Sequence, residues 1–117
     1  MDRKTIHRYI QWLLSFMAIG YILAFILIAS LRLFYPYELE WIEGANVREI
    51  LWIMEGNFPY VPPSPSFVPL AYNPFFFMIS ALLMKILGVG FVAPRLVSIL
   101  ATLGCLVIVY AIVKNET

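Results

Sequence analysis

Residues 9–31, between Arg8 and Arg32, contain no charged side chain and consist mainly of Leu, Ile, Phe and Ala. An α-helix rises about 1.5 Å per residue, so this run can cross a hydrocarbon layer of about 30 Å. The whole chain is 62% hydrophobic and only 13% charged, which is unlike a water-soluble domain. We therefore predict an all-α membrane protein whose first membrane-spanning helix covers residues 9–34.

Two further apolar segments follow, which brings the expected number of transmembrane helices to about three. Residues 96–113 lie between Arg95 and Lys114 and carry no charge, so residues 94–113 are predicted to form the third span. Residues 73–93 are the candidate for the second span, although only about residues 73–87 can form a continuous helix after the prolines that precede them.

The positions of the basic residues predict the orientation of these helices. Arg3, Lys4 and Arg8 precede the first span, and such residues favour the cytoplasmic side. Residues 1–8 are then cytoplasmic, residues 35–72 form an outer loop, and Arg95 lies on the opposite side from that loop as a topology anchor. A retained helix is favoured over a cleaved signal because the apolar run exceeds a typical signal core. The net charge of +1 gives no indication of nucleic-acid binding.

The first part of the outer loop has a helical pattern from residue 43 to residue 55. Its apolar residues recur at i, i+3, i+4 and i+7: Val47, Ile50, Leu51 and Met54. The segment is too short and too charged to span, so we expect an amphipathic helix that lies in the membrane interface with its apolar face on lipid. Trp41 and Trp52 suit the headgroup level.

The second part of the loop, residues 58–74, is rich in proline. Six prolines occur there: Pro59, Pro62, Pro63, Pro65, Pro69 and Pro74. Proline at this density excludes helix and favours extended, pre-ordered backbone. Because aromatic residues are interleaved with the prolines, we predict a shaped loop that folds against another part of the protein.

Three glutamates, Glu38, Glu40 and Glu43, cluster just outside the first span. Glu43 precedes the predicted helix, where the helix dipole favours negative charge. If residues 37–41 are extended, Glu38 and Glu40 point the same way, and Glu40 can approach Glu43 across the turn. Such carboxylates can act as a general base and as a ligand for sugar hydroxyls. A solvated acidic loop with one capping glutamate is an equal alternative.

Other polar residues give weaker indications. Arg48 can hold a lipid phosphate or lie over Trp52, and a salt bridge or a headgroup contact is the plainer reading. Cys105 lies inside the last apolar run, where a small packing residue is expected. His7 is interpreted as a surface histidine. We predict neither an organic cofactor nor a metal site, and a divalent metal has no support in the sequence.

The order of the motifs is similar to that of a known family. The outer loop reads PYELEWIEGANVREILWIMEGNFPY, then FVPLAYNPFFF enters the next apolar segment, and LGVGFVAPRLVSIL enters the last. This order, over residues 9–113, resembles the N-terminal part of GT-C membrane glycosyltransferases, in particular protein O-mannosyltransferases and aminoarabinose transferases of the family 39 type.

The resemblance implies an enzyme of a prokaryotic plasma membrane that transfers a sugar, with inversion, from a polyprenyl-phosphate donor to a lipid or protein acceptor. It maps the catalytic carboxylate to the segment Glu40–Glu43, with Glu43 followed by Gly44 as the better match and Glu40 as the second candidate. Ile42 stands where relatives often have aspartate. Five more residues of the loop region are expected to bind substrate: Glu38, Arg48, Tyr60, Tyr72 and Asn73. Some relatives carry a lysine near this last position.

GT-C enzymes have many more transmembrane helices than this chain. We therefore expect an N-terminal fragment, inactive alone, whose partners are the sugar donor, membrane lipid and the remaining helices of a full-length or split enzyme. The alternative is a small non-enzymatic membrane subunit or scaffold that packs with partner helices.

Overall fold

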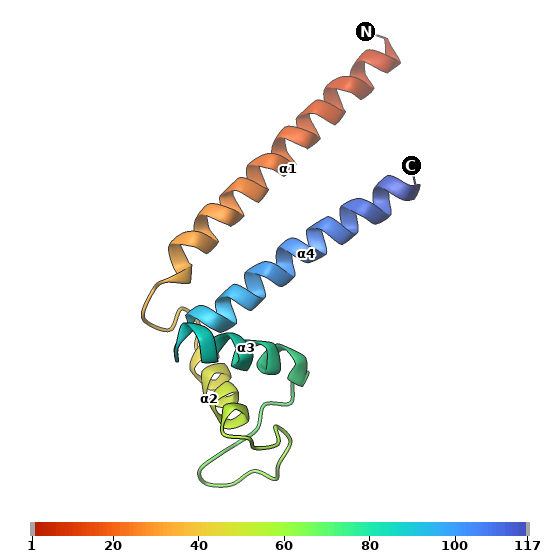
Figure 1. Cartoon of the computed structure of the whole chain (residues 1–117). Coiled ribbons are helices and arrows are strands. Elements are labelled where there is room, and N and C mark those ends of the chain that lie inside the picture. The colour runs from red at the N-terminus through yellow and green to blue at the C-terminus, as the bar shows by residue number, and fades with distance from the viewer. Residues whose placement is uncertain (1, 117) are drawn as a thin grey trace. The chain divides into compact units, whose positions relative to one another are not determined.

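The computed structural model describes residues 2–116, which form helices and no strand (Figure 1). The helices are α1 (Arg3–Leu33), α2 (Glu43–Met54), α3 (Pro74–Leu87) and α4 (Val92–Glu116). The chain divides into one unit that ends at Arg32 and a second that begins at Leu33 and contains α2, α3 and α4. The expected all-α fold is thus confirmed for the described residues.

Two of these helices, α1 and α4, are long and apolar enough to cross a membrane. With 31 and 25 residues, they extend about 46 Å and about 37 Å, more than the hydrocarbon thickness of about 30 Å. None of the residues of α1 is buried, and the buried residues of α4 are confined to its first turn. They correspond to the predicted spans at residues 9–34 and 94–113.

Helix α3 is shorter than the predicted second span at residues 73–93. Asn73 caps its N-terminus by accepting a hydrogen bond from the backbone N–H of Phe75 at 3.0 Å, and Pro74 follows at the first helical position. The helix ends at Gly88, whose φ of +92° favours glycine. Its 14 residues extend about 21 Å, so α3 is shorter than a full hydrocarbon layer of about 30 Å.

The core of the second unit lies where α3 packs against α2 and α4. It contains these buried residues: Ile50, Phe77, Ala81, Met84 and Ala93. The apolar face of α2 packs against this cluster through Val47, Leu51 and Met54, which are partly buried. The expectation that this face rests on lipid is therefore wrong, because α3 covers it.

Helix α3 carries one row of apolar residues that stay exposed. They recur along one side of the helix at positions Phe75, Met78, Leu82 and Ile86. An amphipathic helix that lies at an interface presents such a face.

The proline-rich loop folds against α2, as its composition predicts. The Trp52 indole stacks on Phe67 with 4.1 Å between ring centroids, and its N–H donates to the carbonyl of Phe58 at 3.0 Å. The Tyr60 hydroxyl donates to the carbonyl of Tyr72 at 2.7 Å, which closes the two ends of the loop. These contacts give the loop a defined shape without regular secondary structure.

Candidate functional site

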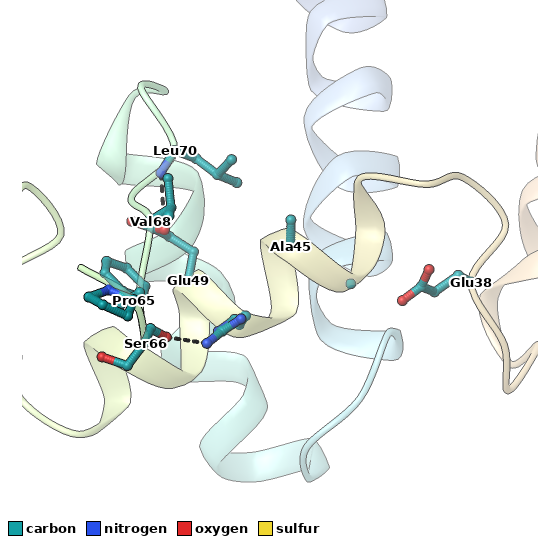
Figure 2. Close-up of a pocket in the computed structure, with 10 residues that line it drawn as sticks. Glu38, Ala45, Glu49, Pro65, Ser66, Val68 and Leu70 are labelled. Atoms are coloured by element: carbon teal, nitrogen blue, oxygen red, sulfur yellow. Dashed lines mark hydrogen bonds between the residues drawn. The ribbon is translucent and has the colours of Figure 1, made fainter. Parts of the chain in front are cut away.

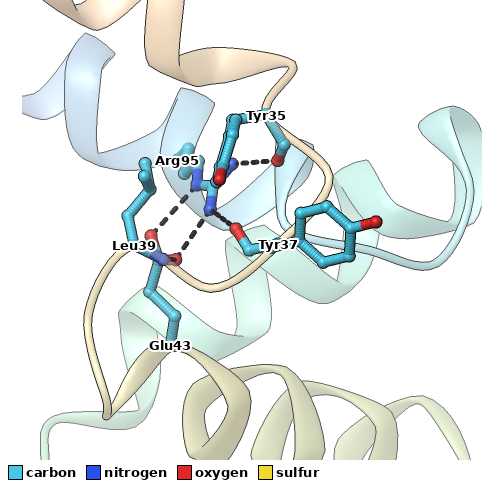
Figure 3. A network of polar contacts seen from close by, with 5 residues as sticks. All are labelled: Tyr35, Tyr37, Leu39, Glu43 and Arg95. Atoms are coloured by element: carbon cyan, nitrogen blue, oxygen red, sulfur yellow. Dashed lines mark hydrogen bonds and ion pairs between the residues drawn. The ribbon is translucent and has the colours of Figure 1, made fainter.

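An ion pair between Glu43 and Arg95 organises the acidic segment (Figure 3). The Arg95 guanidinium contacts both carboxylate oxygens, with Nε 3.0 Å from Oε1 and Nη2 2.7 Å from Oε2. The same group donates to the carbonyls of Tyr35, at 2.6 Å, and Tyr37, at 2.8 Å. Glu43 Oε2 also accepts from the N–H of Leu39 at 2.7 Å. Residues 35–39 are thereby wrapped around one buried cation.

The positions of Glu43 and Arg95 in their helices explain why the two side chains form an ion pair. Arg95 lies in the first turn of α4, where the helix dipole disfavours positive charge, and Glu43 lies in the first turn of α2, where it favours negative charge. The Glu43 carboxylate offsets the unfavourable position of Arg95, while the dipole of α2 stabilises the negative charge of Glu43. The guanidinium also lies over the Phe91 ring, 5.0 Å from its centroid. Arg95 is only 8% exposed.

This contact corrects the predicted position of Arg95. Residues expected on opposite sides of a membrane are instead joined by a 2.7 Å ion pair, so Arg95 lies beside the acidic loop. The hydrogen bond from Arg95 to the Tyr35 carbonyl brings the two ends of residues 35–95 together. Helices α2 and α3, which pack against each other, lie within this stretch of the chain.

The other two glutamates take different positions. Residues 37–41 form bends and a turn rather than an extended strand, so the expected parallel arrangement of Glu38 and Glu40 is not formed. The turn is closed by a hydrogen bond from the N–H of Glu43 to the carbonyl of Glu40 at 3.0 Å. The Glu40 side chain is exposed. The Glu38 carboxylate lies against Gly44, where a Cβ atom would overlap its Oε1.

The remaining predicted binding residues hold the fold together in this structure. Arg48 donates to the carbonyl of Ser66 and fixes the proline-rich loop to α2. The ring partner of Trp52 is Phe67, and the cation–π pair among the described residues is that of Arg95 with Phe91. Tyr60 and Tyr72 are brought together, as described above, and Asn73 caps α3.

A pocket of about 530 Å³ opens between α2 and the proline-rich loop (Figure 2). Its lining includes the predicted residues Glu38 and Arg48, and also Glu49, which the sequence had not indicated. Periodicity places Glu49 away from the apolar face of α2, yet it is 1% exposed because the loop covers that side. One indirect indication of this burial was present in the sequence, which was the expectation that the proline-rich loop folds against another element.

The residues that could bind a metal ion or react as a thiol are not grouped into a site in the described part of the chain. Within residues 2–116, no three His, Cys, Asp or Glu side chains are grouped so that they could hold a metal ion. Cys105 is exposed on α4, so it has no packing role within this chain. His7 is exposed, and its Nε2 lies 3.1 Å from the Gln11 amide.

Comparisons with family models, curated proteins and solved structures give no match to this chain.

Proposed function

We propose that this chain supplies the first outer loop of an integral membrane glycosyltransferase of the GT-C type. The enzyme transfers a sugar from a polyprenyl-phosphate donor to a hydroxyl group of a lipid or protein acceptor. The observation that carries this proposal is the exposed Glu40 carboxylate on a turn that the Glu43–Arg95 ion pair holds in place. A fixed turn that presents an accessible carboxylate is what positioned base catalysis requires.

Glu40 fits the role of general base better than Glu43. Both oxygens of Glu43 already accept hydrogen bonds, from Arg95 and from the Leu39 N–H. Within residues 2–116 the Glu40 side chain has no hydrogen-bond partner and is open to solvent. We therefore assign Glu40 as the base and Glu43 as a positioning residue. The resemblance of the motifs had instead made Glu43 the first candidate for the base and Glu40 the second.

The reaction balances as a single displacement. The Glu40 carboxylate takes the proton of the acceptor hydroxyl, and the acceptor oxygen forms the new bond to the anomeric carbon. The bond from that carbon to the polyprenyl phosphate oxygen breaks, and the phosphate leaves with the electron pair. One displacement inverts the configuration of the sugar. A positioned base contributes about 10²–10⁴ in rate.

The proposal includes a topology with two spans in this chain, α1 and α4. Residues 35–91 then stay on the outer side, and both ends of the chain face the cytoplasm. Three basic residues in the first turns of α1 and one in the last turn of α4 lie at the proposed cytoplasmic ends: Arg3, Lys4, Arg8 and Lys114. The exposed apolar face of α3 lies in the outer interface.

The test compares single substitutions in membranes that contain the complete enzyme. Glu40→Gln should reduce kcat by about 10²–10⁴ and leave the KM for the donor unchanged, because only base catalysis is lost. Glu43→Gln should alter kcat and KM together, because the turn loosens. Glu55→Gln, at the far end of α2 and exposed, is the matched control and should have full activity. Full activity of Glu40→Gln would contradict the assignment.

A further inference from the structure

The pocket beside α2 is a candidate ligand site that the catalytic proposal does not use. One wall is the N-terminal half of α2 and the other is the loop segment at residues 65–70 (Figure 2). Its volume of about 530 Å³ lies within the range of about 300–1,000 Å³ for small-molecule sites.

Glu49 is the feature that points to a ligand. Its side chain is 1% exposed, and its Oε2 accepts a hydrogen bond from the Leu70 N–H at 3.2 Å. Its other oxygen, Oε1, is buried and has no hydrogen-bond partner among the described residues. Burial of a carboxylate oxygen without a donor is costly, and natural proteins pair such groups. The missing donor can be supplied by a molecule that occupies the pocket.

The charges around the pocket select the kind of ligand. Glu38 and Glu49 contribute two carboxylates, and Arg48 is the cation of the lining. The Arg48 guanidinium is already engaged with the Ser66 carbonyl. The excess of carboxylates disfavours a phosphate and favours groups that donate hydrogen bonds, which are hydroxyl and amino groups.

The rest of the lining is apolar and suits the carbon face of a sugar ring. Phe67, Val68 and Leu70 come from the loop, and Ala45 comes from α2. The Phe67 ring is held in place by its stack on Trp52. A site with an apolar wall and a few fixed acceptors is typical of small polar ligands.

We infer that this pocket binds the glycosyl ring, through hydroxyl or amino donors to Glu49 and Glu38, and that it does not bind the phosphate of the donor. The identity of the ligand as a sugar rests on the proposed glycosyltransferase function. The preference of the pocket for hydrogen-bond donors does not depend on that function, because it rests on the unpaired Glu49 oxygen and on the two carboxylates of the lining.

Trp52 provides a probe for the test because it stacks on a residue of the pocket wall. The whole chain is purified in detergent with Trp12→Phe and Trp41→Phe, which leaves Trp52 as the single tryptophan. Its fluorescence is titrated with glucose, glucosamine and inorganic phosphate at constant ionic strength. We expect a saturable change with the sugars and none with phosphate. Glu49→Gln should weaken sugar binding about tenfold or more, since it removes a charged acceptor.

Two further variants keep the test informative if Glu49→Gln unfolds. Val68→Phe adds bulk at an exposed position of the wall and should block binding while the helical circular dichroism is retained. Glu55→Gln, directly after α2 and outside the pocket, should bind sugar normally.

The inference is overturned by absence of saturable sugar binding, by preferential binding of phosphate, or by equal binding in the Val68→Phe variant. Sugar binding together with full transfer activity of Glu40→Gln would instead overturn the proposed base and leave the pocket in place. The two proposals therefore fail separately.

Discussion

Replacement of Arg95 by methionine should release the acidic segment from the rest of the fold. Methionine keeps much of the side-chain length and removes the charge together with every donor of the guanidinium. The Glu43 carboxylate then loses both contacts with the arginine, and the carbonyls of Tyr35 and Tyr37 lose their donor. Leu39 continues to donate to Glu43.

The expected magnitude follows from the burial of the pair. Removal of one partner of a buried ion pair costs about 3–5 kcal/mol. The Glu43 side chain is 21% exposed and Arg95 is 8% exposed, so water can partly solvate the carboxylate that remains, and the lower end is expected. A cost of about 3 kcal/mol corresponds to about a hundredfold change in the equilibrium for opening of the segment.

Hydrogen exchange measured by mass spectrometry on the reconstituted chain tests this prediction. Amide hydrogens in residues 35–43, including that of Leu39, should exchange about a hundredfold faster in Arg95→Met than in the original chain. Arg95→Lys should give an intermediate rate, because a single ammonium group cannot reproduce the planar fork of the guanidinium.

Arg48→Met is the matched control. Arg48 holds the Ser66 carbonyl, so its loss should raise exchange in residues 64–70 and leave residues 35–43 protected. Unchanged exchange of residues 35–43 in Arg95→Met would refute the role assigned to the ion pair.

Three other substitutions test separate parts of the fold. Phe77→Ala should destabilise the second unit by about 3–5 kcal/mol, since Phe77 is 1% exposed in its core; an unchanged thermal midpoint would contradict the packing described. Gly44→Ala should keep or raise stability, by up to about 1 kcal/mol, while it displaces the Glu38 carboxylate and weakens sugar binding in the Trp52 assay. Tyr60→Phe should cost about 1 kcal/mol by removing the bond to the Tyr72 carbonyl, and exchange near Tyr72 should rise about fivefold.

The long helices and α2 could be predicted because their signals are local. Charge-free runs identify α1 and α4, and the spacing of apolar residues with Gly56 at the end identifies α2. Asn73 and Pro74 also mark the start of α3. Each of these features depends only on residues close to one another in the sequence, so a sequence pattern can detect it.

The position of α3 and the partner of Glu43 could not be predicted in the same way. A short apolar helix followed by Gly88 and Gly90 is compatible both with a membrane crossing and with a surface helix. The deciding contact joins Glu43 to Arg95, 52 residues later, and no local pattern encodes it. Glu49 was missed for a related reason, because the element that buries it is an irregular loop.

Cysteine labelling of intact cells tests the central claim, that residues 35–91 stay on one side of the membrane. In a Cys105→Ser background, which removes the native cysteine, single cysteines replace Thr5, Phe58 or Val89, all of which are exposed. A membrane-impermeant maleimide should label Phe58→Cys and Val89→Cys in intact cells, and Thr5→Cys only after permeabilisation. Labelling of Val89→Cys only after permeabilisation would contradict the account, because it would place the α3–α4 connection on the side opposite the acidic loop.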